Sequence, residues 1–203
     1  MVRRRAVTLT ELLSGEILKL QVKSKEGSKW ILQHKDTEIA LNASEAPEEL
    51  KEDDTLEVFL FVDRRGNLSA TTQLPSIQKG TYGWARVIKV SEKEGAFVDI
   101  GTSKEVQVKA EDLPKIKELW PAQGDHLYMT LRTDREGELF GRLATEDRVE
   151  ELYIDAPTTL LNSNLQARPY RLLPVGTFLL SVPENYRVFV HESERVEEPR
   201  LGQ

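Results

Sequence analysis

Cysteine and long hydrophobic runs are both absent from the 203-residue chain. Without cysteine there are no disulfides, no thiolate zinc sites and no cysteine nucleophiles, which favours a reducing, cytoplasmic location. No run approaches the roughly 20 apolar residues that a membrane-spanning helix needs, so we expect no membrane association. The basic start at Arg3–Arg5 has no long apolar segment behind it, which argues against a signal peptide.

An excess of basic charge is missing as well. The net charge is −6 and the pI is about 5.3, whereas many nucleic-acid-binding proteins carry a basic field. Residues 1–75 hold 11 Lys and Arg against 13 Asp and Glu, residues 76–145 hold 11 of each, and residues 146–203 hold 6 against 10. Phosphate binding therefore requires local basic faces, and we expect its affinity to be modest and sensitive to salt.

A catalytic or metal-binding pattern is not visible either. His34, His126 and His191 fall in separate parts of the chain, so their spacing builds no metal site within one element. The pair Asp53–Asp54 is typical of a solvated loop before a strand rather than of an acid–base pair. The glycines are scattered at turns instead of forming a phosphate-binding loop. We therefore predict a protein that is not an enzyme and needs no cofactor.

What the chain does have is an internal repeat. A predicted strand at Thr55–Val62, a turn at Asp63–Gly66 and a second strand at Leu68–Thr72 form one frame. The same frame returns at His126–Thr133, followed by a turn at Asp134–Gly137. In an Asp-x-x-Gly turn the aspartate caps the turn and the glycine supplies a positive φ. Both stretches are therefore predicted to be β-hairpins.

Two further matches extend the repeat toward the N-terminus. Glu38–Pro47 aligns with Glu105–Pro114, and Gly15–Val22 aligns with Gly80–Val87. The unit is thus about 65–70 residues long and contains three strands, a short irregular or helical link, and a hairpin. Five short strands with β-branched and aromatic residues predict a small closed barrel of the OB type.

A third copy follows a polar, partly helical stretch. Ala167–Leu173, Gly176–Leu180 and Arg187–Glu194 match the first three strands of the repeat, but no closing hairpin follows them. We therefore expect an incomplete third barrel in a truncated chain, because a three-stranded remnant exposes sheet edges. The predicted fold is all-β, with tandem five-stranded barrels. The expected parts are a first barrel at 1–75, a second at 76–145, a helical or irregular linker at 146–163, and the start of a third barrel at 164–203.

Three short motifs resemble the signature of the S-one domain, an RNA-binding OB domain named after the largest small-subunit ribosomal protein. They are Gly95-Ala-Phe-Val98, Gly176-Thr-Phe-Leu179 and Val190-His-Glu-Ser-Glu194. The order of the whole chain is similar to the conserved virulence factor B family. That resemblance implies tandem S-one-like domains followed by a winged helix, and an RNA-binding, regulatory function. The first repeat departs from the motif with Ser28–Ile31, which implies a degenerate barrel kept for packing or protein contact.

The candidate binding residues follow from this resemblance and from how OB faces work. Such a face stacks bases on aromatic side chains while basic groups track the phosphates. The candidates are Trp30, Phe97 and Phe178 at equivalent second-strand positions, Asn42, Lys109 and His191 at equivalent third-strand positions, and Tyr82, Trp84, Arg86 and Lys89 on the first strand of the second repeat.

Each candidate also has a structural interpretation. An aromatic residue in a barrel strand commonly belongs to the core, which applies to Phe97 and Phe178. Trp84 fits equally well in the packing against a neighbouring barrel, and Tyr82 and Lys89 fit a plain solvent-exposed surface. The arginines at 3–5 either bind phosphate or belong to a frayed terminus.

Three functional hypotheses result. In the first, linked barrels bind single-stranded RNA with low sequence specificity, and two weak sites on one chain reinforce each other. In the second, the same barrels form a protein–protein adaptor. The third is a factor associated with the ribosome or with RNA polymerase.

Overall fold

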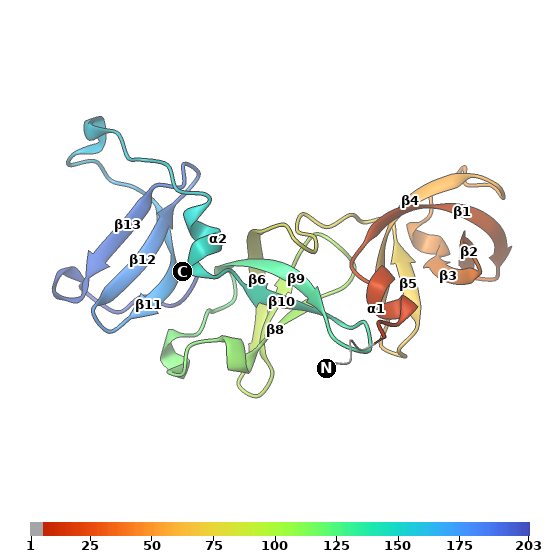
Figure 1. Ribbon diagram of the computed structural model, residues 1–203, viewed down its shortest axis with the longest axis horizontal. Helices are drawn as coiled ribbons and strands as arrows, with labels where there is room; N and C mark the ends of the chain where they lie inside the picture. Colours follow the sequence, from red (N-terminus) through yellow and green to blue (C-terminus); the bar gives the residue numbers. More distant parts are fainter. Residues whose placement is uncertain (1–5) are drawn as a thin grey trace. The chain divides into compact units, whose positions relative to one another are not determined.

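The computed structural model describes residues 6–203, so the expectation for Arg3–Arg5 lies outside the described residues. Within this range the chain forms two closed five-stranded barrels and a separate three-stranded sheet (Figure 1). The predicted all-β class with tandem OB barrels is therefore confirmed. None of the helices in the described range is long and apolar enough to cross a membrane.

The first barrel has the strand order β1-β2-β3-β5-β4. Its elements are α1 (Leu9–Leu13), β1 (Ile17–Glu26), β2 (Lys29–His34), β3 (Thr37–Asn42), the 3-10 helix η1 (Ala43–Glu45), β4 (Thr55–Val62) and β5 (Leu68–Thr71). Along β1, Leu20 and Val22 are buried while Lys19 and Gln21 are exposed, because successive side chains of a strand point to opposite faces. A parallel pairing between β3 and β5 closes the barrel.

The second barrel repeats this plan with the order β10-β8-β7-β6-β9. Its elements are β6 (Gly83–Ser91), β7 (Gly95–Asp99), β8 (Val106–Lys109), the 3-10 helices η2 (Ala110–Asp112) and η3 (Lys117–Leu119), β9 (His126–Thr133) and β10 (Leu139–Leu143). The hairpin strands β4 and β9 coincide with the strands predicted from the repeat, and β5 ends one residue earlier than expected.

The Asp-x-x-Gly turns work as the sequence predicts. The Asp63 carboxylate accepts two backbone N–H bonds of its own turn, at 2.8 and 2.9 Å. Asp134 accepts two in the same way, both at 2.9 Å. Gly66 and Gly137 adopt φ angles of 83° and 82°, a region that an L-residue rarely enters. The two hairpins therefore share one local mechanism.

The remainder of the chain forms a short linker and the third sheet, whose strand order is β11-β12-β13. Its elements are α2 (Glu146–Glu150), η4 (Thr158–Leu160), β11 (Ala167–Leu173), β12 (Gly176–Ser181), β13 (Arg187–His191) and η5 (Glu192–Glu194). The helical part of the linker is thus limited to one α-helix of five residues and one 3-10 turn. The three strands correspond to the first three strands of each barrel.

The chain divides into two compact units. The first contains residues 1–81, 100–106 and 131–141, and the second contains residues 82–99, 107–130 and 142–203. The first barrel lies entirely in the first unit. The third sheet lies entirely in the second unit, together with β6, β7 and most of β8. The domain limits expected from the repeats stay a prediction.

Within the second unit, the third sheet packs directly on the second barrel. Tyr128 of β9, Val149 of α2 and Leu180 of β12 form one buried cluster. At the far end of the chain, the Arg200 guanidinium binds the carboxylate of Asp125 through two bonds of 3.1 and 3.3 Å. The sheet is therefore fixed to the barrel both where it begins and where it ends.

Candidate nucleic-acid interface

A β-bulge near the middle of each first strand defines the equivalent positions in the three repeats. The pairing register shifts between Val22 and Ser24 in β1, between Val87 and Lys89 in β6, and between Pro169 and Arg171 in β11. Directly after the shift, the second-strand partners are Ile31, Phe97 and Phe178. The register thus aligns the repeats independently of any sequence motif.

This register corrects the expected equivalence of Trp30 with Phe97 and Phe178, which is wrong by one residue. Ile31 holds that position, and Trp30 pairs with Lys25 and Leu41 instead. The Trp30 ring packs against the core of the first barrel, and the Lys25 Nζ lies 5.4 Å from the ring centroid. The shift arises because the turn between β1 and β2 differs from the motif turn, so counting residues from the motif misplaces the strand.

The expected equivalence on the third strands is confirmed. Asn42, Lys109 and His191 each precede a 3-10 helix as its N-cap. The Asn42 Oδ1 accepts a bond of 3.1 Å from the Ser44 backbone N–H. The His191 Nδ1 accepts a bond of 3.2 Å from the backbone N–H of Ser193. The three side chains therefore leave their strands at the same point of the fold.

Three faces can now be defined by equivalent residues, taken from the strand after the bulge, its partner, and the two outward positions of the third strand. The first-barrel face is Ser24, Ile31, Ala40 and Asn42; the second-barrel face is Lys89, Phe97, Gln107 and Lys109; the third-sheet face is Arg171, Phe178, Phe189 and His191. Aromatic and cationic side chains increase from the first face to the third.

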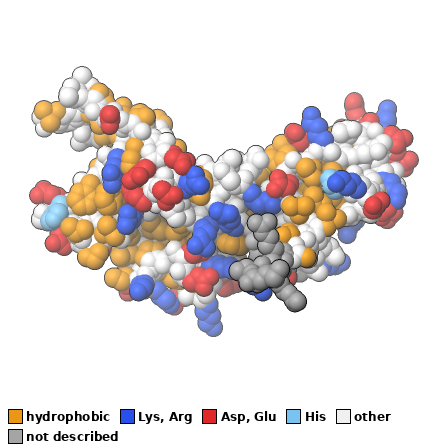
Figure 2. All heavy atoms as spheres, viewed as in Figure 1, with side chains coloured by type: hydrophobic (Ala, Val, Ile, Leu, Met, Phe, Trp, Pro, Cys, Tyr) orange, Lys and Arg blue, Asp and Glu red, His pale blue; other side chains and the backbone are white. Residues whose placement is uncertain are grey.

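The third-sheet face contains a compact group of rings. The centroids of Phe178 and Phe189 are 4.8 Å apart, and Tyr170 lies 6.3 Å from Phe178. His191 meets Phe189 edge-on at 6.4 Å. Phe189 is 45% exposed although it is a large apolar residue. In Figure 2, hydrophobic side chains gather over this sheet beside basic and acidic groups.

Two arginines lie close to these rings. The guanidinium carbon of Arg187 is 4.8 Å from the Phe178 centroid and that of Arg171 is 5.9 Å from it. Arg187 also lies 5.0 Å from the centroid of Tyr153. Guanidinium groups over aromatic faces gain cation–π attraction and remain able to donate hydrogen bonds at their edges. The sheet therefore combines ring surfaces with fixed positive charge.

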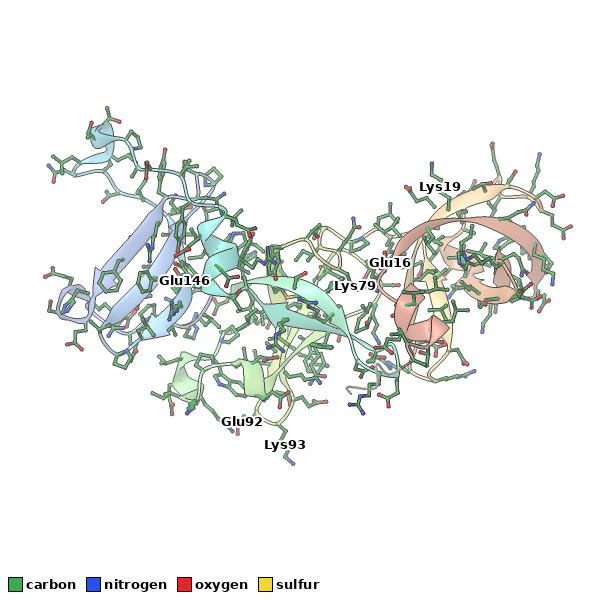
Figure 3. All side chains as sticks on the ribbon, in the orientation of Figure 1. Glu16, Lys19, Lys79, Glu92, Lys93 and Glu146 are labelled. Carbon is green, nitrogen blue, oxygen red and sulfur yellow. The ribbon has the colours of Figure 1, made fainter. Side chains whose placement is uncertain are left out.

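One carboxylate, Glu146 of α2, holds these arginines in place (Figure 3). It accepts bonds from Arg171 at 3.1 Å and Arg187 at 3.5 Å, and from the hydroxyls of Tyr153 and Tyr170 at 2.7 and 3.0 Å. Burial raises the pKa of Glu146, but the hydrogen bonds from these tyrosines and from Arg171 outweigh it, so its net pKa is lowered. Glu146 therefore stays ionised at neutral pH.

The second-barrel face follows the same plan with fewer rings. Phe97 is half-buried between Ala96 and Val98, which are both fully buried, so its side chain lies on the outer side of the strand. The Lys89 Nζ lies 4.2 Å above the Phe97 ring. Arg86 is exposed on the same strand, opposite Asp99. Gly95 of β7 approaches the backbone of Lys109 so closely that an added Cβ would overlap it. Phe97, Lys89 and Lys109 thus lie on neighbouring strands.

Two of the predicted site residues take part in packing. Trp84 lies 5.2 Å from Tyr128 and Tyr82 lies 6.1 Å from it, between ring centroids. Both pack on the buried cluster between the second barrel and the third sheet, and the Arg168 guanidinium covers Trp84 at 5.4 Å. The structural interpretation of Trp84 given by the sequence is the one that these contacts support.

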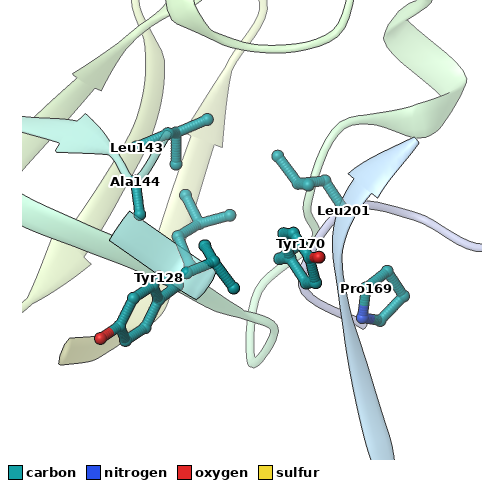
Figure 4. Close-up of a pocket in the computed structure, with 8 residues that line it drawn as sticks. Tyr128, Leu143, Ala144, Pro169, Tyr170 and Leu201 are labelled. Atoms are coloured by element: carbon teal, nitrogen blue, oxygen red, sulfur yellow. The ribbon is translucent and has the colours of Figure 1, made fainter. Parts of the chain in front are cut away.

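The cavity beside this cluster is too small for a ligand. It is lined by Leu127, Tyr128, Leu143, Ala144, Val149, Pro169, Tyr170 and Leu201 (Figure 4). Its volume is about 10 Å³, which is at most the space that one water molecule needs. Among the described residues, no group of three or more His, Asp or Glu side chains is placed to hold a metal ion. The outer faces are therefore the candidate site.

Sequence reasoning missed four residues of the third sheet. These are Tyr170, Arg171, Arg187 and Phe189. For two of them a signal was present: the stretch from Arg187 to His191 alternates polar or aromatic residues with valines, and such alternation places Arg187, Phe189 and His191 on one face. The motif drew attention to the histidine alone.

Comparison with known proteins agrees with this architecture. A model of the S1 domain matches residues 14–73, the CvfB first S1-like domain matches 82–142, and the second domain of the virulence regulatory factor CvfB matches 149–203. The class of protein is thus defined by fold and sequence together: a tandem S1-like, OB-domain protein.

The relatives extend over nearly the whole chain. Conserved virulence factor B of Staphylococcus aureus is 43% identical over 205 residues, covering 97% of this chain and 66% of the relative. The protein of the same name from Staphylococcus haemolyticus is 44% identical over 201 residues, covering 97% of this chain and 67% of the relative. The chain belongs to the conserved virulence factor B (CvfB) family. It spans about two thirds of the length of these relatives.

A solved structure is similar throughout. It is a multidomain protein with nucleic acid binding domains from Streptococcus pneumoniae, 33% identical to this chain with a TM-score of 0.84. The match covers 95% of this chain and 67% of the other protein. The tandem arrangement of S1-like folds is therefore shared with a crystallised relative.

Proposed function

We propose that this chain binds single-stranded RNA, with low sequence specificity, through the third-sheet face and the second-barrel face. One observation carries the proposal. On the third-sheet face, a 45% exposed phenylalanine, Phe189, lies beside a second ring and two guanidinium groups. Exposed rings bordered by cations are what OB-type proteins use to stack unpaired bases and track phosphates.

The acidic balance of the chain is compatible with this proposal. Phosphate contacts act within a Debye length of about 10 Å at 0.1 M salt, so the local arrangement of charge outweighs the total. Lys89, Arg171 and Arg187 lie within 6 Å of the aromatic rings on the two faces. Binding is therefore expected to be weak at each face and to fall steeply with salt.

The likeness to known proteins supports a regulatory, non-catalytic role. The relatives are called virulence factors, one matching domain model is named for a virulence regulatory factor, and the similar structure is described as having nucleic acid binding domains. We propose by extension that this chain acts in the cytoplasm by binding RNA in the control of gene expression, rather than by catalysing a reaction.

A fluorescence anisotropy titration with labelled oligouridine of about 10 nucleotides tests the proposal, since OB folds cover roughly 4–16 nucleotides each. The purified chain is compared with the double variant Phe178→Ala and Phe189→Ala. Each lost stacking contact is worth about 1–3 kcal/mol, so the double variant should bind at least about fivefold more weakly. Raising the salt should weaken binding of the unaltered chain.

The matched control is Ile31→Ala, which removes the equivalent apolar side chain from the first-barrel face and should leave binding unchanged. If the unaltered chain shows no salt-dependent binding, the RNA proposal is wrong. Recovery of ribosomal proteins or RNA polymerase subunits on the immobilised chain after nuclease treatment would then favour the adaptor or the machine-associated alternative.

A further inference from the structure

The two phenylalanines of the third-sheet face differ in how much of each ring is available. Phe178 is half-buried and has Tyr170, Phe189, Arg171 and Arg187 within 6.3 Å of its centroid. Phe189 is 45% exposed. A base needs an open ring face of roughly its own size, so Phe189 offers a stacking surface, whereas Phe178 serves mainly to support its neighbours.

The position of the Phe189 ring depends on a glycine in the adjacent strand. Gly176 pairs with His191 across β12 and β13, and the Phe189 ring lies against its Cα. A Cβ added at Gly176 would overlap this ring, with the Cε2 only 2.7 Å away. Because glycine has no side chain, the ring lies flat along the sheet, and its outer surface faces solvent.

His191 presents a defined hydrogen-bonding group next to this ring. Its Nδ1 accepts the backbone N–H of Ser193 at 3.2 Å and lies 2.9 Å from the Ser193 hydroxyl. A backbone N–H can only donate, so the Nδ1 must be unprotonated and the neutral ring must carry its proton on Nε2. His191 is exposed. The imidazole therefore presents an N–H donor to solvent at the edge of Phe189.

We propose that Phe189 and His191 form a subsite for one unpaired nucleobase, in which the base stacks on Phe189 and an acceptor atom of its edge or backbone receives the His191 Nε2–H. This inference rests on the proposed RNA-binding function and assigns roles within it. Phe189 is the stacking residue, Gly176 positions the ring, and Ser193 fixes the tautomer of the histidine.

The subsite belongs to the third sheet alone. At the position of Phe189 the other two faces carry Ala40 and Gln107, neither of which has a ring for stacking. At the position of His191 the first barrel has Asn42, whose Oδ1 accepts the Ser44 N–H in the same manner. An asparagine at this position therefore keeps the cap and leaves its NH₂ as a donor.

Two single variants of the full chain separate the roles of the rings. Leucine keeps an apolar side chain but removes the π face, so Phe189→Leu should weaken oligouridine binding by about 5- to 150-fold, the equivalent of one stacked base. Phe178→Leu should weaken it less. If Phe178→Leu has the larger effect while the unaltered chain binds, the inference is wrong and the proposed function stands. If the unaltered chain does not bind, both fail.

A second pair of variants tests His191. The change His191→Ala removes one hydrogen bond, worth about 0.5–1.5 kcal/mol, and should weaken binding by about 2- to 13-fold. The change His191→Asn should restore most of that loss, because asparagine reproduces the cap and the donor. Equal losses for the two variants would overturn the role assigned to the donor.

The tautomer can be checked without any RNA. A long-range proton–nitrogen correlation spectrum of the ligand-free chain near neutral pH should show the His191 proton on Nε2 and an unprotonated Nδ1. In the variant Ser193→Pro, which removes the backbone donor, both tautomers should be populated. A proton found on Nδ1 in the unaltered chain would overturn the arrangement, whatever the RNA-binding result.

Discussion

The first-barrel face and the third-sheet face share one backbone frame but differ in every side chain at the four defining positions. Ser24, Ile31, Ala40 and Asn42 stand where Arg171, Phe178, Phe189 and His191 stand in the third sheet. The bulge, the pairing and the 3-10 helix after the third strand are the same in both. The frame is therefore a scaffold, and binding chemistry depends on the side chains placed on it.

The two regions also bury their apolar residues differently. The first barrel closes on itself and encloses its own core, in which Leu32, Ile39 and Leu41 are fully buried. The third sheet has three strands, and its Leu180 is buried against Tyr128 and Val149, outside the sheet. The stability of the third-sheet face is thus tied to its neighbour, whereas the first barrel depends on internal packing.

The largest expected effect tests this difference in packing. Leu180→Ala removes a fully buried side chain and should cost about 2–5 kcal/mol. The loss should be confined to β11–β13 and the cluster beneath them. Residue-resolved hydrogen exchange measures it, with Leu41→Ala as the matched change in the first barrel. Equal loss of protection in the first barrel after Leu180→Ala would contradict the separation of the two cores.

A smaller effect is expected from making the first face resemble the third. The double change Ile31→Phe and Ala40→Phe places two rings on the first-barrel frame at the positions of Phe178 and Phe189. Oligouridine binding should tighten about fivefold, the lower limit for one added stacking contact. The matched control, Ile31→Leu with Ala40→Leu, adds apolar volume without rings. Equal gains from both pairs would mean that ring chemistry does not distinguish the faces.

The smallest expected effect concerns pH. Because the folded pKa of Glu146 is lowered, its contribution to stability is present above the unfolded value of about 4.3 and is lost as pH falls through the folded pKa. The variant Glu146→Gln should therefore lower the melting temperature by about 2 °C at pH 7 and change it little at pH 3. Thermal melts at both pH values measure this. The exposed Glu48→Gln is the control, and an equal shift at pH 3 would contradict the argument.

Much of the fold was predictable because its signals are local. The Asp-x-x-Gly turns at Asp63 and Asp134 fix two hairpins through backbone bonds within a few residues. The repeats recur at consistent offsets, and the residue before each 3-10 helix was aligned correctly at Asn42, Lys109 and His191. A family resemblance on these motifs then indicated the domain type, which the comparisons confirm.

The site was less predictable because it depends on register and on contacts distant in sequence. A one-residue difference in the first turn moved Trp30 from the outer face to the core and brought Ile31 outward. Tyr82 and Trp84 pack on Tyr128, a contact that their own strand does not reveal. Glu146 was counted as part of an acidic linker, yet it binds two arginines that are 25 and 41 residues away in sequence.

The two ends of the third sheet are tied to the second barrel, through Val149 before its first strand and through Arg200 after its last. Both faces proposed to contact RNA therefore belong to one compact unit. For a strand that reaches from Phe97 to Phe189, the second contact would form without ordering a flexible tether, so little of its binding energy would be spent on restricting the protein. Weak individual faces would then suffice to retain a long strand while still releasing short ones.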